Sequence, residues 1–414
     1  MTIMTRSNNY TALQTLASEM EKELRQDILP YWPRFIDRGN GGFYGNIDNE
    51  GKFDPRAAKG IVMHARQLWT YAGAARRLQD PALLSTADAA FKFIVEKLYD
   101  KRNKGFHWAV DHTGGTPVLD RKVVYGQAFA IYALSEYARS GGPRMALDLA
   151  LETYGILERA ARDGDHGGYF EACSEDWSRA VSAPLSDADM ACDKSMNTNL
   201  HMMEALSSLY AASKDSGVLG ALRALIEIHL KKILATPEHL GLYFTKEWTR
   251  LDAIASFGHD IEASWLLTEA AECAWEGSVP GSVRSSALAI AAGTARRLDE
   301  NSGSLPEEMR NGRLESDRIW WVQAEAIVGM VNAWELSGDP GYLDRAARVW
   351  DFVKNHILDR AHGEWLWGAH ADGNPMKDKP KGGFWKAGYH NGRACMEIMA
   401  RAARAAQSRG MPHA

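Results

Sequence analysis

The stretch Asn103–Asp111, NKGFHWAVD, recurs along the chain with small changes and decides the fold. Each copy is a turn in which a glycine precedes aromatic and apolar residues in alternation. Five copies are recognised by their glycines, which are Gly42, Gly105, Gly168, Gly241 and Gly363. The steps between them are 63, 63, 73 and 122 residues, and the last step equals two steps of 61. We therefore predict six units, with a degenerate turn at NSGSLPEE near residue 302.

Between successive turns, the sequence predicts two helices that differ in burial. The first helix of a unit has one apolar stripe and is expected to be half-exposed, as in the segment 81–99. The second is apolar nearly all round, as in VVYGQAFAIYALSEYA from Val123 and WWVQAEAIVGMVNAW from Trp320, which is typical of a helix buried on both sides. The stripe of the segment 81–99 consists of Leu84, Ala87, Phe91, Ile94 and Leu98.

Six alternating pairs predict an all-α fold, an (α/α)6 barrel with an outer and an inner ring of helices. The expected outer helices cover roughly residues 9–28, 81–99, 143–161, 217–234, 279–298 and 340–357. The expected inner helices cover roughly residues 60–78, 122–140, 194–213, 259–276, 318–337 and 388–407. No Pro/Ser-rich linker interrupts the series, so we expect residues 1–414 to form a single catalytic domain. An open α-solenoid also stacks helix pairs, but the long aromatic connections and the six units favour a closed ring.

The composition argues against nucleic-acid and membrane partners. The formal net charge of -5 offers no basic surface, and no apolar run is long enough for a signal peptide or a membrane span. The four cysteines are far apart without a CxxC pair, and reduced thiols suit the cytoplasm. We expect a cytoplasmic protein that is a monomer or a weak homodimer.

Polar residues gather at the start of every expected inner helix. Because inner helices of such a barrel run parallel, their N-termini meet at one mouth, where their positive potential favours an anionic ligand or an oxyanion. The chemistry-bearing residues expected there are His64, Arg66 and Gln67; Tyr125 and Gln127; Asn197, Asn199, His201 and Glu204; His259, Asp260 and Glu262; Gln323 and Glu325; and His390, Asn391 and Arg393.

Each of these residues also has an ordinary structural interpretation. His64 could simply be packed, and Asp260 could interact with its own helix dipole. Glu262 lies three residues after His259 on the same helical face and could orient that ring. Glu204 and Glu325 could be buried partners of Arg66 or Arg393. The functional interpretation is favoured because His201, His259 and His390 fall at corresponding places in three separate units.

Several motifs resemble those of the N-acylglucosamine 2-epimerase superfamily, most closely its cellobiose 2-epimerase branch. They are SFGHDIEASWLL, KSMNTNLHMMEAL, WWVQAEA and FWKAGYHNGRACMEI, and the likeness extends from GGFYGNID and KGIVMHARQLWTYA over nearly the whole chain. The resemblance independently implies an (α/α)6 barrel. Two departures are Asn199, where many cellobiose 2-epimerases have histidine, and Ala387-Gly388, where many have Cys-Pro; they leave the preferred disaccharide open.

The resemblance also implies roles for individual residues. His259 and His390 match the two acid/base groups, and Glu262 matches the residue that holds His259. Arg66 matches a group near the reacting oxygens, and His201 one that takes part in ring opening and enediol handling. The residues expected to contact the sugar are Trp385, Tyr125, Trp320, Trp321, Asn197 and Glu325.

Inversion at C2 of an aldose requires ring opening, removal of the C2 proton and return of a proton from the opposite face. Two bases on opposite walls do this best, and histidine has the most suitable pKa for the work. The guanidinium of Arg66 can stabilise the enediolate. The reaction is redox-neutral, and neither GxGxxG nor GxxxxGK[ST] occurs, so we expect no cofactor and no metal. Aldose-ketose isomerisation and N-acylglucosamine 2-epimerisation remain alternatives. Less favoured are a glycoside hydrolase using Glu262 and Glu325, a metal site at His201, His259 and Glu262, and a non-catalytic sugar-binding protein.

Overall fold

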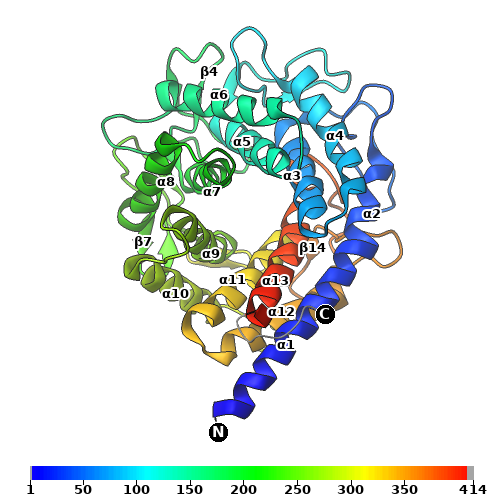
Figure 1. Ribbon diagram of the computed structural model, residues 1–414, viewed down its shortest axis with the longest axis vertical. Coiled ribbons are helices and arrows are strands. Elements are labelled where there is room, and N and C mark those ends of the chain that lie inside the picture. Colours follow the sequence, from blue (N-terminus) through cyan, green and yellow to red (C-terminus); the bar gives the residue numbers. More distant parts are fainter. Residues whose placement is uncertain (1, 408–414) are drawn as a thin grey trace.

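Twelve helices of the described chain alternate between an outer and an inner ring (Figure 1). The computed structural model describes residues 2–407. The outer helices are α1 (Thr2–Glu23), α4 (Leu84–Phe93), α6 (Arg144–Ala160), α8 (Ser216–Ile228), α10 (Gly281–Ala295) and α12 (Pro340–His356). The inner helices are α3 (Ile61–Arg77), α5 (Val124–Arg139), α7 (Met196–Ser213), α9 (Phe257–Ala274), α11 (Trp320–Ser337) and α13 (Tyr389–Gln407).

Three outer helices continue into a π-helical turn, and the first then runs on through two short helices. The π-helical turns are η1 (Leu24–Ile28), η4 (Ile94–Leu98) and η5 (His229–Ile233), and α2 (Leu29–Tyr31) and the 3₁₀ turn η2 (Trp32–Phe35) follow η1. A further 3₁₀ turn, η3 (Pro81–Leu83), precedes α4.

Each inner helix packs on the next one along the chain, and α13 packs back on α3. This last contact closes the ring, so the (α/α)6 barrel is confirmed and the open solenoid is wrong. Each inner helix also packs on an outer one, which buries the inner ring on both sides as its apolar composition predicts. The first outer helix begins at Thr2, earlier than expected. The assignment of residues 1–414 to one domain stays a prediction.

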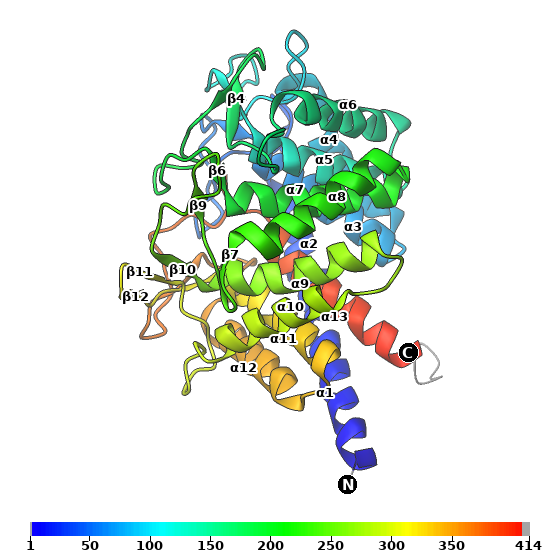
Figure 2. The ribbon, with the colours of Figure 1, turned by 90° about the vertical axis from the view of Figure 1, so that its left-hand side faces the viewer.

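Short antiparallel strands connect neighbouring units at one end of the barrel (Figure 2). Three two-stranded pairs are β1 (Lys59–Gly60) with β2 (Ala109–Val110), β6 (Lys194–Ser195) with β9 (Tyr243–Phe244), and β13 (Arg318–Ile319) with β14 (Gly368–Ala369). A fourth pair is β7 (Leu234–Thr236) with β8 (His239–Leu240). The three-stranded sheets are β3 (Arg121–Val123), β4 (Ala172–Ser174) and β5 (Ala180–Val181), and β10 (Ile254–Ser256), β11 (Glu308–Arg310) and β12 (Arg313–Glu315). In most units, a strand therefore leads directly into an inner helix.

In five units, the backbone of the glycine-aromatic turn is hydrogen-bonded to a side chain of the inner helix that follows it. That side chain belongs to the fourth residue of the helix. In the second unit, the Gln127 side chain accepts from Phe106 N and donates to Phe106 O, both at 2.8 Å. Gly105 in this turn has a φ of +65°, and a Cβ there would lie 2.9 Å from Gln127 Oε1, so the turn requires glycine. The corresponding side chains are His64, Asn199, Asp260 and Gln323.

The same bond confirms the degenerate turn near residue 302, the fifth along the chain, because Leu305 N donates to Gln323 Oε1 at 2.9 Å. His64 is packed in this structural role, as one interpretation allowed, since its Nε2 accepts from Phe43 N at 3.0 Å. Asp260 lies in the first turn of α9, as its interpretation as a helix-dipole residue requires, and it also accepts from Leu240 N at 2.9 Å and from His239 Nδ1 at 2.7 Å. Five of the polar residues expected at the mouth thus stabilise the turns instead.

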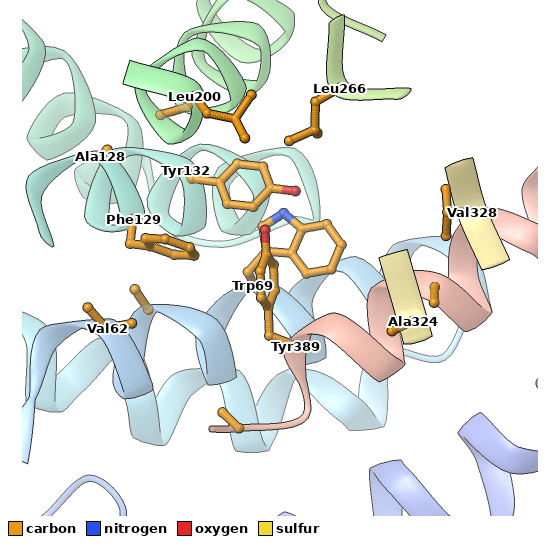
Figure 3. Close-up of a cluster of buried hydrophobic side chains, with 14 of the residues drawn as sticks. Val62, Trp69, Ala128, Phe129, Tyr132, Leu200, Leu266, Ala324, Val328 and Tyr389 are labelled. Atoms are coloured by element: carbon orange, nitrogen blue, oxygen red, sulfur yellow. The ribbon is translucent and has the colours of Figure 1, made fainter. Parts of the chain in front are cut away.

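Aromatic and aliphatic side chains of the inner helices pack together in the barrel interior (Figure 3). Trp69 stacks on Tyr132 with ring centroids 5.2 Å apart, and its edge meets Tyr389 at 5.3 Å. Figure 3 shows these three rings pointing toward one another from α3, α5 and α13. No helix in the described part of the chain combines the length and apolarity needed to cross a lipid bilayer.

Candidate active site

A cavity of about 290 Å³ opens at the N-terminal ends of the inner helices. All three histidines of the sequence prediction line it, and so do most of the other predicted site residues. These are Arg66, Tyr125, Asn197, His201, His259, Glu262, Trp320, Trp321, Trp385 and His390. The sixth position of four inner helices carries a titratable group and faces the barrel axis, while the fourth position faces the turn; these groups are Arg66, His201, Glu262 and Glu325.

His390 is oriented by a buried carboxylate. Its Nδ1 lies 2.7 Å from Glu325 Oε1, and Glu325 Oε2 accepts from Trp265 Nε1 at 3.0 Å. Glu325 was expected to contact the sugar, but it lies behind His390 rather than in the cavity wall. Burial, together with the charges of Arg66 and Arg393, lowers the pKa of His390 well below its ordinary value, so the ring is neutral at physiological pH.

His201 is oriented in the same way by its own helix. Its Nδ1 lies 2.8 Å from Oε2 of Glu204, three residues later. Burial raises the pKa of Glu204, but the charge of Arg393 and the bond to His201 outweigh it and bring that pKa to about 2. The carboxylate is therefore ionised and accepts the Nδ1 proton, which leaves a lone pair on Nε2.

His259 is held by Ser256, which precedes the helix, rather than by Glu262. Nδ1 of His259 lies 2.8 Å from Ser256 Oγ, and its ring packs against Trp321 with centroids 4.8 Å apart. Burial, with the nearby His201, lowers its pKa to about 4. The expected support of His259 by Glu262 is wrong, because the Glu262 carboxylate turns to Arg393 instead. Among the described residues, no hydrogen bond engages Nε2 of any of the three rings.

Arg393 lies behind the residues that line the cavity and bonds three buried carboxyl groups. Its Nη2 donates to Glu262 Oε1 at 2.6 Å and to Glu325 Oε1 at 2.7 Å, and its Nη1 donates to Glu204. The predicted pairing of Glu204 and Glu325 with an arginine is thereby confirmed. Burial and the charge of Glu325 raise the pKa of Glu262 to about 8, and burial also raises the pKa of Glu325. One proton is therefore retained between these two carboxyl groups at neutral pH.

One cluster of the described residues has the spacing of a metal site, and it differs from the set considered in the sequence. Ligand atoms of Glu262, Glu325 and His390 lie within 4.8 Å of one another, whereas His201 and His259 are not part of it. The Arg393 guanidinium already bonds both carboxylates of this cluster. The positive charge of Arg393 therefore accounts for the close approach of these two carboxyl groups.

Arg66 projects from α3 into the cavity and is fixed by contacts on several sides. Its Nη2 donates to Tyr125 Oη at 3.1 Å, and its Nη1 donates to the carbonyl oxygen of Trp385. The guanidinium carbon lies 4.7 Å from the centroid of the Phe129 ring. A planar cation held in this way can stabilise an oxyanion without moving.

The outer part of the cavity contains residues that the sequence did not reveal. It is lined by the loop residues Ser186 and Asp189, by Tyr243 of β9, by Glu307, by Glu308 and Arg310 of β11, and by Trp367. Asp189 accepts from Tyr243 Oη at 2.5 Å, which ties the loop to the wall. Trp367, in the recurring turn HGEWLWGAH, Tyr243, in the recurring turn LGLYFTKEW, and Ser256, directly before GHDIE, carried a signal, whereas the others lie in segments without a repeat.

An (α/α)6 barrel whose axial cavity presents three neutral imidazoles and a fixed guanidinium defines an acid/base enzyme class rather than a simple binding protein. Residues 42–394 match the N-acylglucosamine 2-epimerase (GlcNAc 2-epimerase) family, and the chain belongs to this family.

Similar proteins support the same assignment. The chain is 39% identical to the cellobiose 2-epimerase of Bacteroides fragilis over 389 residues, which cover 93% of this chain and 99% of that protein. It is 45% identical to the cellobiose 2-epimerase structure from Spirochaeta thermophila, with a TM-score of 0.91 and coverage of 95% and 98%. A D-mannose isomerase structure, with 23% identity, a TM-score of 0.82 and coverage of 92% and 97%, shares the fold.

Proposed function

We propose that the chain is a cofactor-independent sugar 2-epimerase. It interconverts glucose and mannose at the reducing end of a β-1,4-linked disaccharide such as cellobiose or lactose. The observation that carries the proposal is the convergence of His259, His390 and Arg66 on one cavity, with Nε2 of both rings unengaged by the described residues. The full-length similarity to cellobiose 2-epimerases supports the disaccharide.

The first steps open the pyranose ring and remove the C2 proton. Ring opening moves the O1 proton to O5, with His201 placed to carry it. One imidazole then takes the C2 proton through Nε2, the C2–H electron pair forms the C1–C2 double bond, and the carbonyl π electrons move to O1. The resulting enediolate is an oxyanion beside the Arg66 guanidinium.

The proton that returns to the opposite face of C2 comes from the second imidazole. In its acid form, His390 carries its proton on Nε2 while Glu325 carries one that faces Nδ1. As Nε2 of His390 donates its proton to C2, Glu325 transfers its own proton to Nδ1. The pair of His390 and Glu325 therefore ends with one proton fewer. The other imidazole has gained one proton, and exchange with water restores the starting form. The proton retained between Glu262 and Glu325 supplies this acid form.

The other activities fit the site less well. A glycoside hydrolase needs two free carboxyl groups on either side of the glycosidic bond, but Glu262 and Glu325 are both bonded to Arg393. An aldose-ketose isomerase would share the enediolate and reprotonate C1. The assignment of each site residue to a step is part of the proposal, as are the cytoplasmic location, the monomeric or weakly dimeric state, and the absence of nucleic-acid and membrane partners.

Proton NMR in D2O with cellobiose, lactose, mannose and N-acetylglucosamine tests the function. We expect cellobiose and lactose to give products with a mannose reducing end that carries deuterium at C2, because the proton passes through exchangeable imidazoles. A ketose product would favour aldose-ketose isomerisation, and turnover of N-acetylglucosamine alone would favour N-acylglucosamine 2-epimerisation. Release of monosaccharides from the disaccharides would refute all three activities.

We also expect the reaction to persist into mildly acidic solution. A base must be neutral, and the pKa of His259 is lowered from 6.5 to about 4, so protonation inactivates it only as the pH falls toward that value. The alkaline limb should lie near pH 8, where the pair of Glu262 and Glu325 loses its retained proton. The profile of kcat/KM against pH measures both limbs. An acid limb at pH 6.5 or above would contradict the neutral, buried imidazole, provided that enzyme returned to pH 7 recovers full activity.

A further inference from the structure

Arg393 joins carboxylates from three other inner helices. It lies on α13, is only 1% exposed, and contacts Glu204 of α7, Glu262 of α9 and Glu325 of α11. Its guanidinium carbon lies 4.8 Å from the Trp265 ring centroid and 4.5 Å from that of Tyr389. These ring contacts fix the plane of the fork, so its hydrogen bonds have defined directions.

Two of the three carboxylates that Arg393 contacts also hold a histidine. Glu204 uses Oε1 for Arg393 and Oε2 for His201 Nδ1, and Glu325 uses the same atom, Oε1, for both Arg393 and His390 Nδ1. Each imidazole is therefore separated from the guanidinium by one carboxylate. His201 and His390 stand on different helices, and Arg393 contacts the carboxylates that orient both.

We propose that Arg393 is a positioning residue that fixes the ring orientation and tautomer of His201 and His390 together, through Glu204 and Glu325. This inference rests on the proposed function only for its kinetic consequences. Arg393 does not line the cavity, so its effect on a sugar passes through the two imidazoles. Lysine cannot replace it fully, because an ammonium lacks the planar fork that meets several carboxylates at once.

The charges around the imidazoles of His201 and His390 determine how the loss of Arg393 changes the pKa values of these rings. The charged and titratable groups that surround them are Arg66 of α3, Tyr125 of α5, Glu204 of α7, His259 and Glu262 of α9, Glu325 of α11, and Tyr389 and Arg393 of α13. Removal of the guanidinium leaves three buried carboxyl groups without their shared cation. The field at both imidazoles becomes more negative, so the pKa of each ring rises.

The experiment compares Arg393→Met and Arg393→Lys with Arg401→Met as the matched control. Arg401 is also buried on α13 and bonds Asn332 and Glu335, but it lies outside the cavity. Nitrogen-15 NMR of labelled imidazoles in the resting enzyme reports tautomer and pKa without turnover. For Arg393→Met we expect both rings to lose the defined tautomer that each has in the wild type and their pKa values to rise by at least about 1 unit. The acid limb of kcat/KM should move up equally, and kcat should fall about 10²-fold with little change in KM.

Arg393→Lys should give the same changes at smaller size, and it supplies the readout if the methionine variant does not fold. Arg401→Met should lower the melting temperature and leave the imidazole spectra and the pH profile as in the wild type. The proposal is overturned if the Arg393 variants lose stability as Arg401→Met does while His201 and His390 keep their tautomers and pKa values. If the spectra change as expected but the wild type does not epimerise any sugar, the coupling stands and the proposed function fails.

Discussion

Replacement of His390 by asparagine is expected to lower kcat for epimerisation by about 10³-fold or more, and His259→Asn should do the same. General acid/base groups contribute on the order of 10² to 10⁴, and each of these rings carries a proton that the other cannot deliver from its own face. Both rings line one cavity, and both pack against Trp321, with centroids 4.8 Å and 5.7 Å away. The measurement is conversion of cellobiose followed by NMR.

A sharper readout separates the two faces of C2. Each variant retains one base, so it should exchange the C2 hydrogen of one epimer with D2O without converting it. The two variants should exchange opposite epimers. Wild-type conversion in either variant would refute the two-base assignment.

The matched control for these substitutions is His64→Gln, because glutamine occupies the corresponding position in the second and fifth units. His64 is buried and bonds Phe43 N, outside the cavity. This variant should keep the wild-type kcat.

Arg66→Met is expected to lower kcat by about 10² to 10³-fold, which corresponds to about 3 to 4 kcal/mol of transition-state stabilisation. The physical reason is that charge develops on O1 only in the enediolate, so the guanidinium acts mainly on the transition state and KM should change little. Arg66→Lys keeps the charge but cannot reach Tyr125 Oη and the Trp385 carbonyl oxygen together, so it should restore only part of the rate.

Arg76→Met is the control for Arg66, since Arg76 lies on the same helix and bonds Glu136 away from the cavity. Steady-state kinetics of the three variants with cellobiose decides the matter. A rise in KM with an unchanged kcat in Arg66→Met would show that Arg66 binds the ground state only, which would contradict its role at the oxyanion.

The prediction of the fold succeeded because its signals repeat along the chain. Six turns of similar spacing and the contrast between half-exposed and fully apolar helices specify paired helices in two rings, and the contact of α13 with α3 confirmed the closure. The histidines were found because they recur at the start of inner helices. Residues at the mouth such as Ser186 and Asp189 were missed because they lie in a loop that does not repeat.

The partners of the histidines could not be predicted from spacing. His201 and Glu204 stand three residues apart and pair at 2.8 Å, whereas His259 and Glu262, at the same spacing, do not pair. His201, the partner of Glu204, stands at the sixth position of α7, and this position faces the barrel axis. His259 stands at the third position, so Ser256 reaches it while Glu262 meets Arg393 from across the barrel.

The sequence by itself determined the helix pairs, their order and the concentration of polar groups at one end, because periodicity and burial are properties of neighbouring residues. Only the tertiary structure decided which of those polar groups stabilise the turns and which face the cavity, and which carboxylate orients which ring. The bonds across the barrel join residues 65 to 189 positions apart, such as His390 with Glu325 and Arg393 with Glu204. Their formation depends on how inner helices pack side by side, which no local pattern encodes.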